Sequence, residues 1–287
     1  AYGFIGDASQ AGGESVAWRI MTSGEGASAV GTLCIARNSV RGYTASTNNA
    51  KMRSFGNTAA TFAPWTGKGM AGGDGDGYSK SFSRVKVMKG VTAGASAERM
   101  FQKCTSLQNA DMTNLTVGAS TTNLYGMFAD CTALRGAYTA QSQTADNTAT
   151  IPTGARFSTL FNPTGTSLYA AYMFSNCTAL EEVNLQSVFN GTTPDLSYMF
   201  TKCSRLRTVT VNNVGNGLRA NMKHMFYDTC SDASAVKDAD TRLTVTNVGN
   251  YNDTAATATS CTDMQFAFAS MHYMHTATVT DVGKGKF

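Results

Sequence analysis

One short pattern recurs along most of this 287-residue chain and constrains its fold more than any other feature. Met100-Phe101 is followed at fixed intervals by Cys104 and Leu107, and three further copies keep the same spacing. The copies recur about every 26 residues, apart from two longer gaps. A segment of this size cannot bury its apolar side alone, so we expect successive units to stack and share one core.

The residues expected in the shared core are the Phe, Cys and Leu of each unit. They are Phe101, Cys104, Leu107, Phe128, Cys131, Leu134, Phe174, Cys177, Leu180, Phe200, Cys203, Leu206, Phe226, Cys230 and Phe268. The fifth copy has one extra residue before Cys230, and the sixth copy, around Phe268, replaces Cys and Leu by Met. Equal spacing predicts ladders of these side chains along the stack.

The apolar period changes within each unit. The Met-Phe, Cys and Leu positions recur every three to four residues, which is the spacing of one face of a helical turn. Val183 and Leu185, and then Val209 and Val211, alternate with polar residues, as in a short strand. This spacing therefore predicts that each unit is a short helix followed by a strand. For the whole chain it predicts an α/β repeat solenoid. The last strand is expected at 276–282.

The repeated pattern Met-Phe-x-x-Cys-x-x-Leu-x-x-Val-x-Leu resembles the BspA-type leucine-rich repeat of bacterial and protist surface proteins. The resemblance covers roughly residues 82–287. It implies a leucine-rich-repeat-like solenoid with a sheet on one face, of a kind used for adhesion or protein recognition. It implies no catalytic residues.

The chain divides by composition into two parts. Residues 1–80 lack the repeat and are rich in Gly, Ala, Ser and Thr, which favours a small N-terminal β-rich module for attachment or assembly. Residues 81–287 form the repeat region, with insertions near 136–168 and 231–262. A Gly-rich run at 67–77 marks the boundary.

Charge and hydropathy argue against several classes of protein. Charged residues make up 15% of the chain and the formal net charge is +4, with no dense Lys/Arg cluster, so we expect no nucleic-acid partner. No apolar run approaches the roughly 18 residues of a spanning helix, so no membrane span is expected. Aromatic residues make up 10%, which predicts a folded chain.

Sites for metals and cofactors are weakly indicated. We expect the cysteine ladder to consist of buried free thiols, although its spacing also allows disulfides or a metal. Asp74 and Asp76 in a Gly-rich loop are candidate calcium ligands, but a plain linker explains them as well. His272 and His275 could share one face of a helical turn, yet no third ligand is identifiable. The sequence predicts no cofactor.

The sequence predicts a non-enzymatic structural or adhesive protein on the exterior of a cell or particle. No catalytic motif is present, and Thr and Asn occupy the strand positions expected to face outward. Asn184, Thr208, Thr210 and Thr278 are the candidate binding residues. The expected partner is a protein or glycan on a surface, and the expected location is extracellular or at the cell surface.

Two other hypotheses stay open. The chain could be a self-assembling fibre, layer or virion subunit whose partner is itself or a neighbouring coat protein, since Ala1 could follow a removed initiator Met as well as a cleaved signal. Alternatively, an enzyme could reside in residues 1–80, where carboxylates alone would supply acid and base groups.

Overall fold

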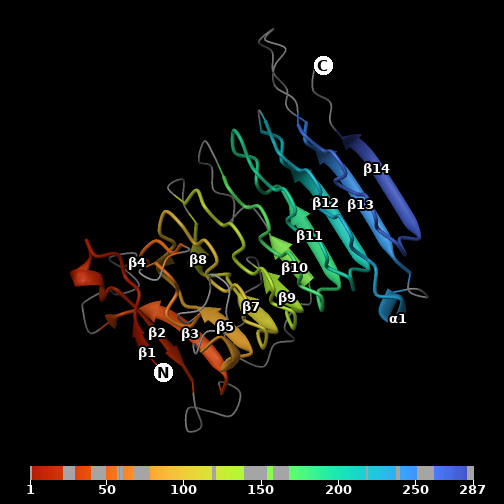
Figure 1. Ribbon diagram of the computed structural model, residues 1–287. Helices are drawn as coiled ribbons and strands as arrows, with labels where there is room; N and C mark the ends of the chain where they lie inside the picture. The colour runs from red at the N-terminus through yellow and green to blue at the C-terminus, as the bar shows by residue number, and fades with distance from the viewer. Residues whose placement is uncertain are drawn as a thin grey trace.

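The computed structural model describes residues 2–21, 30–39, 50–56, 58, 61–66, 78–117, 121–138, 154–157, 168–217, 219–236, 240–250 and 262–282. Its strands form an 11-stranded and a 3-stranded sheet (Figure 1). The large sheet contains, in spatial order, β1 (Tyr2–Phe4), β2 (Val16–Ile20), β3 (Thr32–Arg37), β5 (Arg84–Val87), β7 (Asn109–Asp111), β9 (Gly136–Tyr138), β10 (Gly154–Phe157), β11 (Glu182–Gln186), β12 (Thr208–Val214), β13 (Arg242–Val248) and β14 (Thr276–Val282). The small sheet contains β4 (Ala50–Lys51), β6 (Val91–Thr92) and β8 (Leu115–Thr116).

The large sheet is antiparallel at its N-terminal end and parallel elsewhere. Strands β1, β2 and β3 pair antiparallel, and every pair from β3 to β14 is parallel. Strands β11 to β14 pair without offset, so that Val183, Val209, Leu243 and Ala277 form one continuous row. The pairing of β3 with β5 carries the sheet across residue 80.

The predicted fold class is wrong. We expected an α/β solenoid with a short helix and a strand in each coil, but the described residues are almost entirely strand and turn. Their helices are two single 3-10 turns, η1 (Ala11–Gly13) and η3 (Tyr78–Lys80), and one four-residue helix, α1 (Ala233–Val236). None of the three coincides with a Met-Phe segment. The strand half of each unit is present and the helical half is replaced by turns.

Backbone geometry explains why the Met-Phe segments are not helical. Each contains two residues with left-handed backbone angles, one directly before Met-Phe and a second one four residues after the first: φ is 58° at Tyr172 and 60° at Asn176. A right-handed helix cannot pass through such residues. The backbone N–H of Phe174 donates instead to the carbonyl oxygen of Met199 in the next unit, at 2.8 Å, and that of Phe128 donates to Met173 in the same way.

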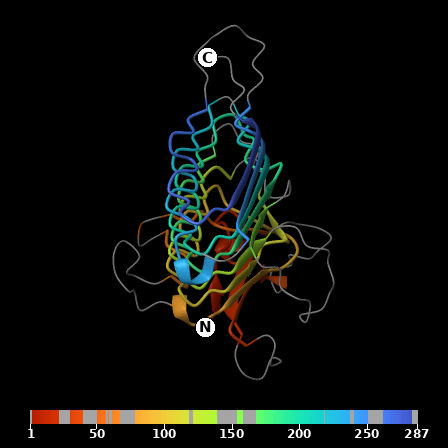
Figure 2. The same cartoon turned by 90° about the vertical axis from the view of Figure 1, so that its right-hand side faces the viewer.

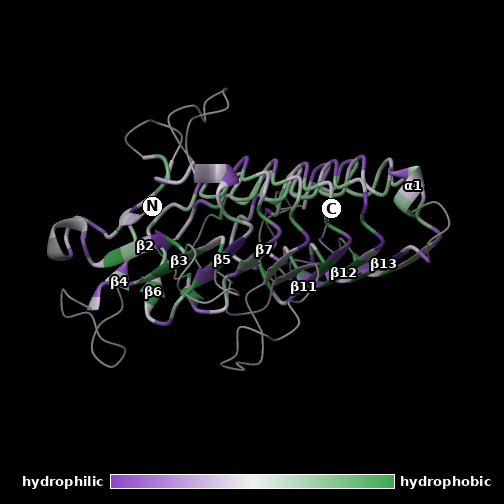
Figure 3. Ribbon diagram, turned by 90° about the horizontal axis from the view of Figure 1, so that it is seen from below, coloured by the Kyte–Doolittle hydropathy of each residue, from purple (hydrophilic) through white to green (hydrophobic). Residues whose placement is uncertain are grey.

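The phenylalanine of each unit stacks on the phenylalanine of the following unit, and these rings form the core beneath the turns. Ring centroids lie 5.2 Å apart between Phe128 and Phe174, and again between Phe174 and Phe200, with nearly parallel planes. We call the whole series the phenylalanine stack: Trp65, Phe101, Phe128, Phe174, Phe200, Phe226 and Phe268. Figure 2 shows the turns on one side of the molecule and the strands on the other, and Figure 3 shows the row of turns and the row of strands running side by side.

The cysteines form a second ladder beside the rings. Cys104, Cys131, Cys177 and Cys203 are fully buried, and the thiol of Cys177 donates to the carbonyl oxygen of Phe128 in the preceding unit, at 3.2 Å. In the fifth unit the equivalent position is taken by buried Thr229, which follows the left-handed residue Asp228. Cys230, the Cys of that copy, is therefore the next residue along, and it is buried too.

Each of the two long gaps in the repeat contributes a strand. β10 lies between β9 and β11 in the sheet, although Phe128 and Phe174 stack directly on each other on the turn side. β13 follows α1 and is the strand of the unit that contains Phe226. The sheet thus gains one strand, β10, that has no ring in the phenylalanine stack.

Replacing Phe174 by Ala tests the phenylalanine stack. The ring is fully buried between two others, so its loss should lower the free energy of unfolding by about 3–5 kcal/mol. Urea denaturation followed by far-UV circular dichroism measures this change. Tyr2→Ala is the matched control, since Tyr2 is 78% exposed and its truncation should cost less than about 1 kcal/mol. Equal losses in the two variants would contradict the assigned role of the stack.

Candidate functional site

The outward side of strands β11 to β14 carries a regular array of mostly uncharged polar side chains, here called the threonine face. Because the strands pair without offset, outward residues form straight rows across them. The central row is Asn184, Thr210, Thr244 and Thr278. The flanking rows are Glu182, Thr208, Arg242 and Thr276 on one side and Gln186, Asn212, Thr246 and Thr280 on the other.

The spacing of the array follows from sheet geometry. Neighbouring strands lie about 4.8 Å apart, and residues two apart on one strand are separated by about 6.6 Å. Valine and leucine fill the alternate, inward positions: Val209, Val211 and Val245 are no more than 1% exposed. The hydroxyl groups of β11 to β13 therefore lie on a rigid sheet whose other side is buried in the core.

Several hydroxyls of the threonine face have no partner. Within the described residues, no hydrogen bond involves the side chains of Thr208, Thr210, Thr244 or Thr278. Thr208, Thr244 and Thr278 are exposed and Thr210 is half-buried. Thr280 does donate to Thr246, at 3.2 Å, along its row. The exposed hydroxyls are available to a ligand.

Charged side chains near the threonine face are held in ion pairs at its margin. Arg207 pairs with Glu181, and Arg242 forms a forked contact with Asp240. The hydrogen bond from Arg242 lowers the pKa of Asp240, which keeps the carboxylate ionised and the pair intact at neutral pH. The paired charges leave the centre of the face electrically neutral.

Asparagine ladders run along the opposite margin, where the strands end. Asn247 donates to the side-chain oxygen of Asn213, at 3.1 Å, and Asn213 donates to Ser187, at 3.0 Å. These three residues share the same left-handed backbone angle, with φ between 51° and 54°. Asn tolerates this conformation better than most residues, and its side-chain amide donates to the preceding unit. The ladders fix the strand ends in register.

The structure brings the four candidate binding residues together. Asn184, Thr210 and Thr278 belong to the central row of the threonine face, and Thr208 lies in the row beside it. Thr244 and Thr246 were not predicted as binding residues, because β13 lies in the segment near 231–262 that the sequence led us to interpret as an insertion. The alternation of Leu243 and Val245 with threonines was the signal that could have revealed them.

A second surface feature, the outer ring row, follows the turns on the far side of the phenylalanine stack. It consists of Tyr125, Tyr169, Tyr172, Tyr198, His224 and Phe266. Ring centroids lie 4.8 Å apart between Tyr172 and Tyr198 and 4.7 Å apart between Tyr198 and His224. Burial, and next the neighbouring Tyr198, raise the pKa of Tyr172, so its phenol stays protonated.

The outer ring row is poorly suited to sugar stacking. Carbohydrate and other flat ligands use the faces of aromatic rings, but each ring here lies with its face against its neighbour. Tyr169 and Phe266 are the exceptions, with 43% and 54% of their surfaces exposed. The row therefore presents mainly ring edges and phenol groups to solvent.

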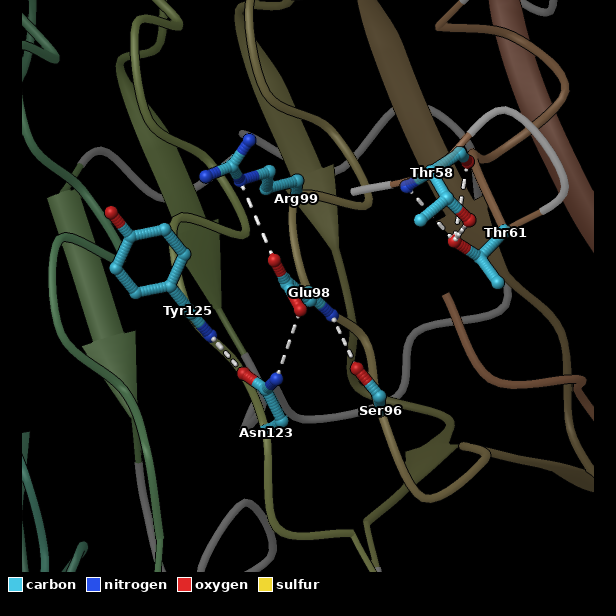
Figure 4. Close-up of polar contacts among 7 residues, drawn as sticks. All are labelled: Thr58, Thr61, Ser96, Glu98, Arg99, Asn123 and Tyr125. Atoms are coloured by element: carbon cyan, nitrogen blue, oxygen red, sulfur yellow. Dashed lines mark hydrogen bonds and ion pairs between the residues drawn. The ribbon is translucent and has the colours of Figure 1, made fainter. Parts of the chain in front are cut away.

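A polar cluster closes the row at its N-terminal end (Figure 4). The Arg99 guanidinium lies 5.3 Å from the centre of the Tyr125 ring and 3.5 Å from Glu98. Asn123 donates to the second oxygen of Glu98, at 3.1 Å, and accepts a bond from the backbone of Tyr125. Since both carboxylate oxygens have partners, the cluster orders the turns rather than offering a general base.

The cysteine ladder holds no disulfide among the described residues. Its thiols are free, and burial raises the pKa of Cys203 to about 12 and the pKa of Cys104 well above its usual value. A thiol in this state is a poor nucleophile and a poor metal ligand. In the described part of the chain, Cys34 is the one half-buried cysteine, and the other five are buried.

The remaining metal candidates are not brought together. His272 lies 3.5 Å from Asp228, whereas His275 hydrogen-bonds to Thr241, at 2.7 Å. Asp74 and Asp76 lie outside the described residues. Within those residues, no group of three His, Cys, Asp or Glu side chains could hold a metal ion. The same part of the chain contains no helix with the length and apolarity needed to cross a membrane.

Comparison with known proteins identifies no relative: no family model, no curated protein and no solved structure matches the chain. The resemblance to BspA-type repeats therefore rests on the sequence motif alone.

The raised thiol pKa values predict how stability depends on pH. A thiol whose pKa is higher in the folded than in the unfolded chain contributes fully to stability below pH 9.0, its ordinary value, and less as the pH rises towards about 12. Unfolding free energies should therefore fall as the pH is raised from about 9 to about 10, within this range. In Cys203→Ala the fall should be smaller by about 1 kcal/mol, because one titrating group is gone. Identical falls in urea titrations of the two proteins would contradict this.

Proposed function

We propose that this chain is a non-enzymatic recognition protein of a cell or particle exterior, and that its threonine face binds an extended, uncharged polysaccharide. The observation that carries the proposal is the in-register row of Asn184, Thr210, Thr244 and Thr278, whose side chains point outward from four neighbouring strands. A ligand with its own regular repeat can meet such a row many times over.

A linear glycan suits this surface chemically. Its sugars present hydroxyl groups at intervals close to the separation of parallel strands, so one sugar could lie over each strand. Threonine supplies a hydroxyl that both donates and accepts, and a methyl group that can contact the apolar side of a sugar ring. Each hydrogen bond contributes only about 0.5–1.5 kcal/mol, so binding depends on the number of strands that the ligand crosses.

A protein ligand suits the surface less well. Protein interfaces draw most of their binding energy from a few buried Trp, Tyr or Arg anchors. On the described part of the threonine face the only such residue is Arg242, which is already paired with Asp240. A neutral face also offers no electrostatic attraction to a charged partner. The array therefore favours a ligand that binds through many equal contacts.

The proposal predicts that blocking the centre of the threonine face abolishes glycan binding. Thr244→Arg places a long charged side chain in the central row, and we expect it to reduce binding to insoluble polysaccharides such as cellulose and chitin, and to glycan arrays, at least tenfold. Thr122→Arg is the matched control, since Thr122 is exposed but lies on the turn side, and it should bind like the parent.

Three outcomes would overturn the proposal. The parent protein could bind no glycan on the panel, Thr244→Arg could bind as well as the parent, or both variants could lose binding equally. Capture of protein ligands by the parent, with no glycan binding, would assign the face to protein recognition instead.

A further inference from the structure

Within the described residues, the outer edge of β14 is a free edge of the large sheet. It is the last strand of the large sheet, and no strand among the described residues pairs with that edge. Six of its seven residues, from Thr276 to Asp281, are exposed. Natural proteins block such edges with proline, lysine or an inward-pointing charge, because free backbone N–H and C=O groups recruit other strands. The Thr-Ala-Thr-Val-Thr run of β14 contains none of these.

The last unit of the stack also exposes apolar side chains at positions that are buried in the preceding units. Val279 is 51% exposed, whereas Val245, its neighbour in the same row, is fully buried. Phe268 ends the phenylalanine stack and is only partly buried, as are Met271 and Met274. A surface of this kind on a folded protein marks an interaction site.

The opposite edge of the sheet cannot supply the missing strand. Its last strand, β1, has three residues against the seven of β14. Head-to-tail association of copies would therefore leave most of β14 unpaired. A second β14 has the same length and the same side-chain alternation, so the edge is best complemented by itself.

We propose that two copies of this chain associate through an antiparallel pairing of their β14 strands about a two-fold axis at Thr278. This goes beyond the proposed function. In this register Thr276 lies opposite Thr280 of the second copy, and Ala277 lies opposite Val279, so hydroxyls meet hydroxyls and apolar groups meet apolar groups.

The two-fold symmetry has two consequences. An isologous interface is closed, so the association stops at a dimer and forms no fibre. The axis is perpendicular to the sheet, so the threonine faces of both copies lie on the same side and form one continuous array. A ligand that spans the junction would engage twice as many strands along the same row.

Light scattering combined with size-exclusion chromatography tests the dimer. The parent should shift from monomer to dimer with rising concentration. Val279→Lys should weaken dimerisation at least tenfold, because it places a charge against the apolar Ala277 of the second copy, while the circular dichroism spectrum stays unchanged. A parent that remains monomeric at all concentrations, or that forms a series of larger species, would overturn the proposal.

Engineered cysteines test the register. In Thr278→Cys the two thiols meet at the axis, within the distance that a disulfide spans, and mild oxidation should give a covalent dimer. In Thr276→Cys the equivalent thiols are four residues out of register, roughly 13 Å apart, and should not couple. The parent controls for its native cysteines. Equal coupling in both variants, or none in Thr278→Cys, would overturn the two-fold pairing, and neither result depends on whether a glycan binds.

Discussion

Face-to-face stacking of one phenylalanine per unit is the interaction on which the rest of this structure depends. Rings from Phe101 to Phe226 lie 5.1–5.2 Å apart, close to the separation of paired strands, so ring stacking and strand pairing can be satisfied at the same time. The same spacing is reinforced by backbone hydrogen bonds between successive Met-Phe segments and by the hydrogen bonds that the cysteine thiols donate to carbonyl oxygens. Trp65 continues the series into the N-terminal part of the chain and donates to the carbonyl oxygen of Met100.

The threonine face is a consequence of that spacing. Because each unit is positioned by its ring, the strands on the opposite side cannot slip relative to one another without breaking the stack, and outward residues fall into straight rows. Thr210 and Thr244 are neighbours in space although they lie far apart in the chain. The same regularity explains why few charged residues occur on the face, because like charges at matched positions on neighbouring strands would repel each other.

The sequence predicted the ring ladder, the strands near 183–185 and 209–211 and the last strand, since their spacing is regular and their apolar residues alternate. It did not predict the turns, because three-to-four-residue spacing is shared by helices and by successive turns. A signal was present: Gly126, Asp130, Asn176 and Asp228 occupy left-handed positions that these residue types favour. Tyr172 and Lys202 occupy equivalent positions without any such preference, and there only the neighbouring unit's hydrogen bonds impose the geometry.

The most direct test of the account is whether β12 and β13 pair in parallel register in solution. The double variant Thr210→Cys and Thr244→Cys places two thiols on adjacent strands at matched positions, where the distance allows a disulfide. The pair Thr208→Cys and Thr246→Cys is four residues out of register and is the control. The account predicts an intramolecular disulfide, detected by mass spectrometry of peptides from the monomer, in the first variant alone. Disulfide formation in the control, or its absence from the matched pair, would contradict the stacked, in-register arrangement.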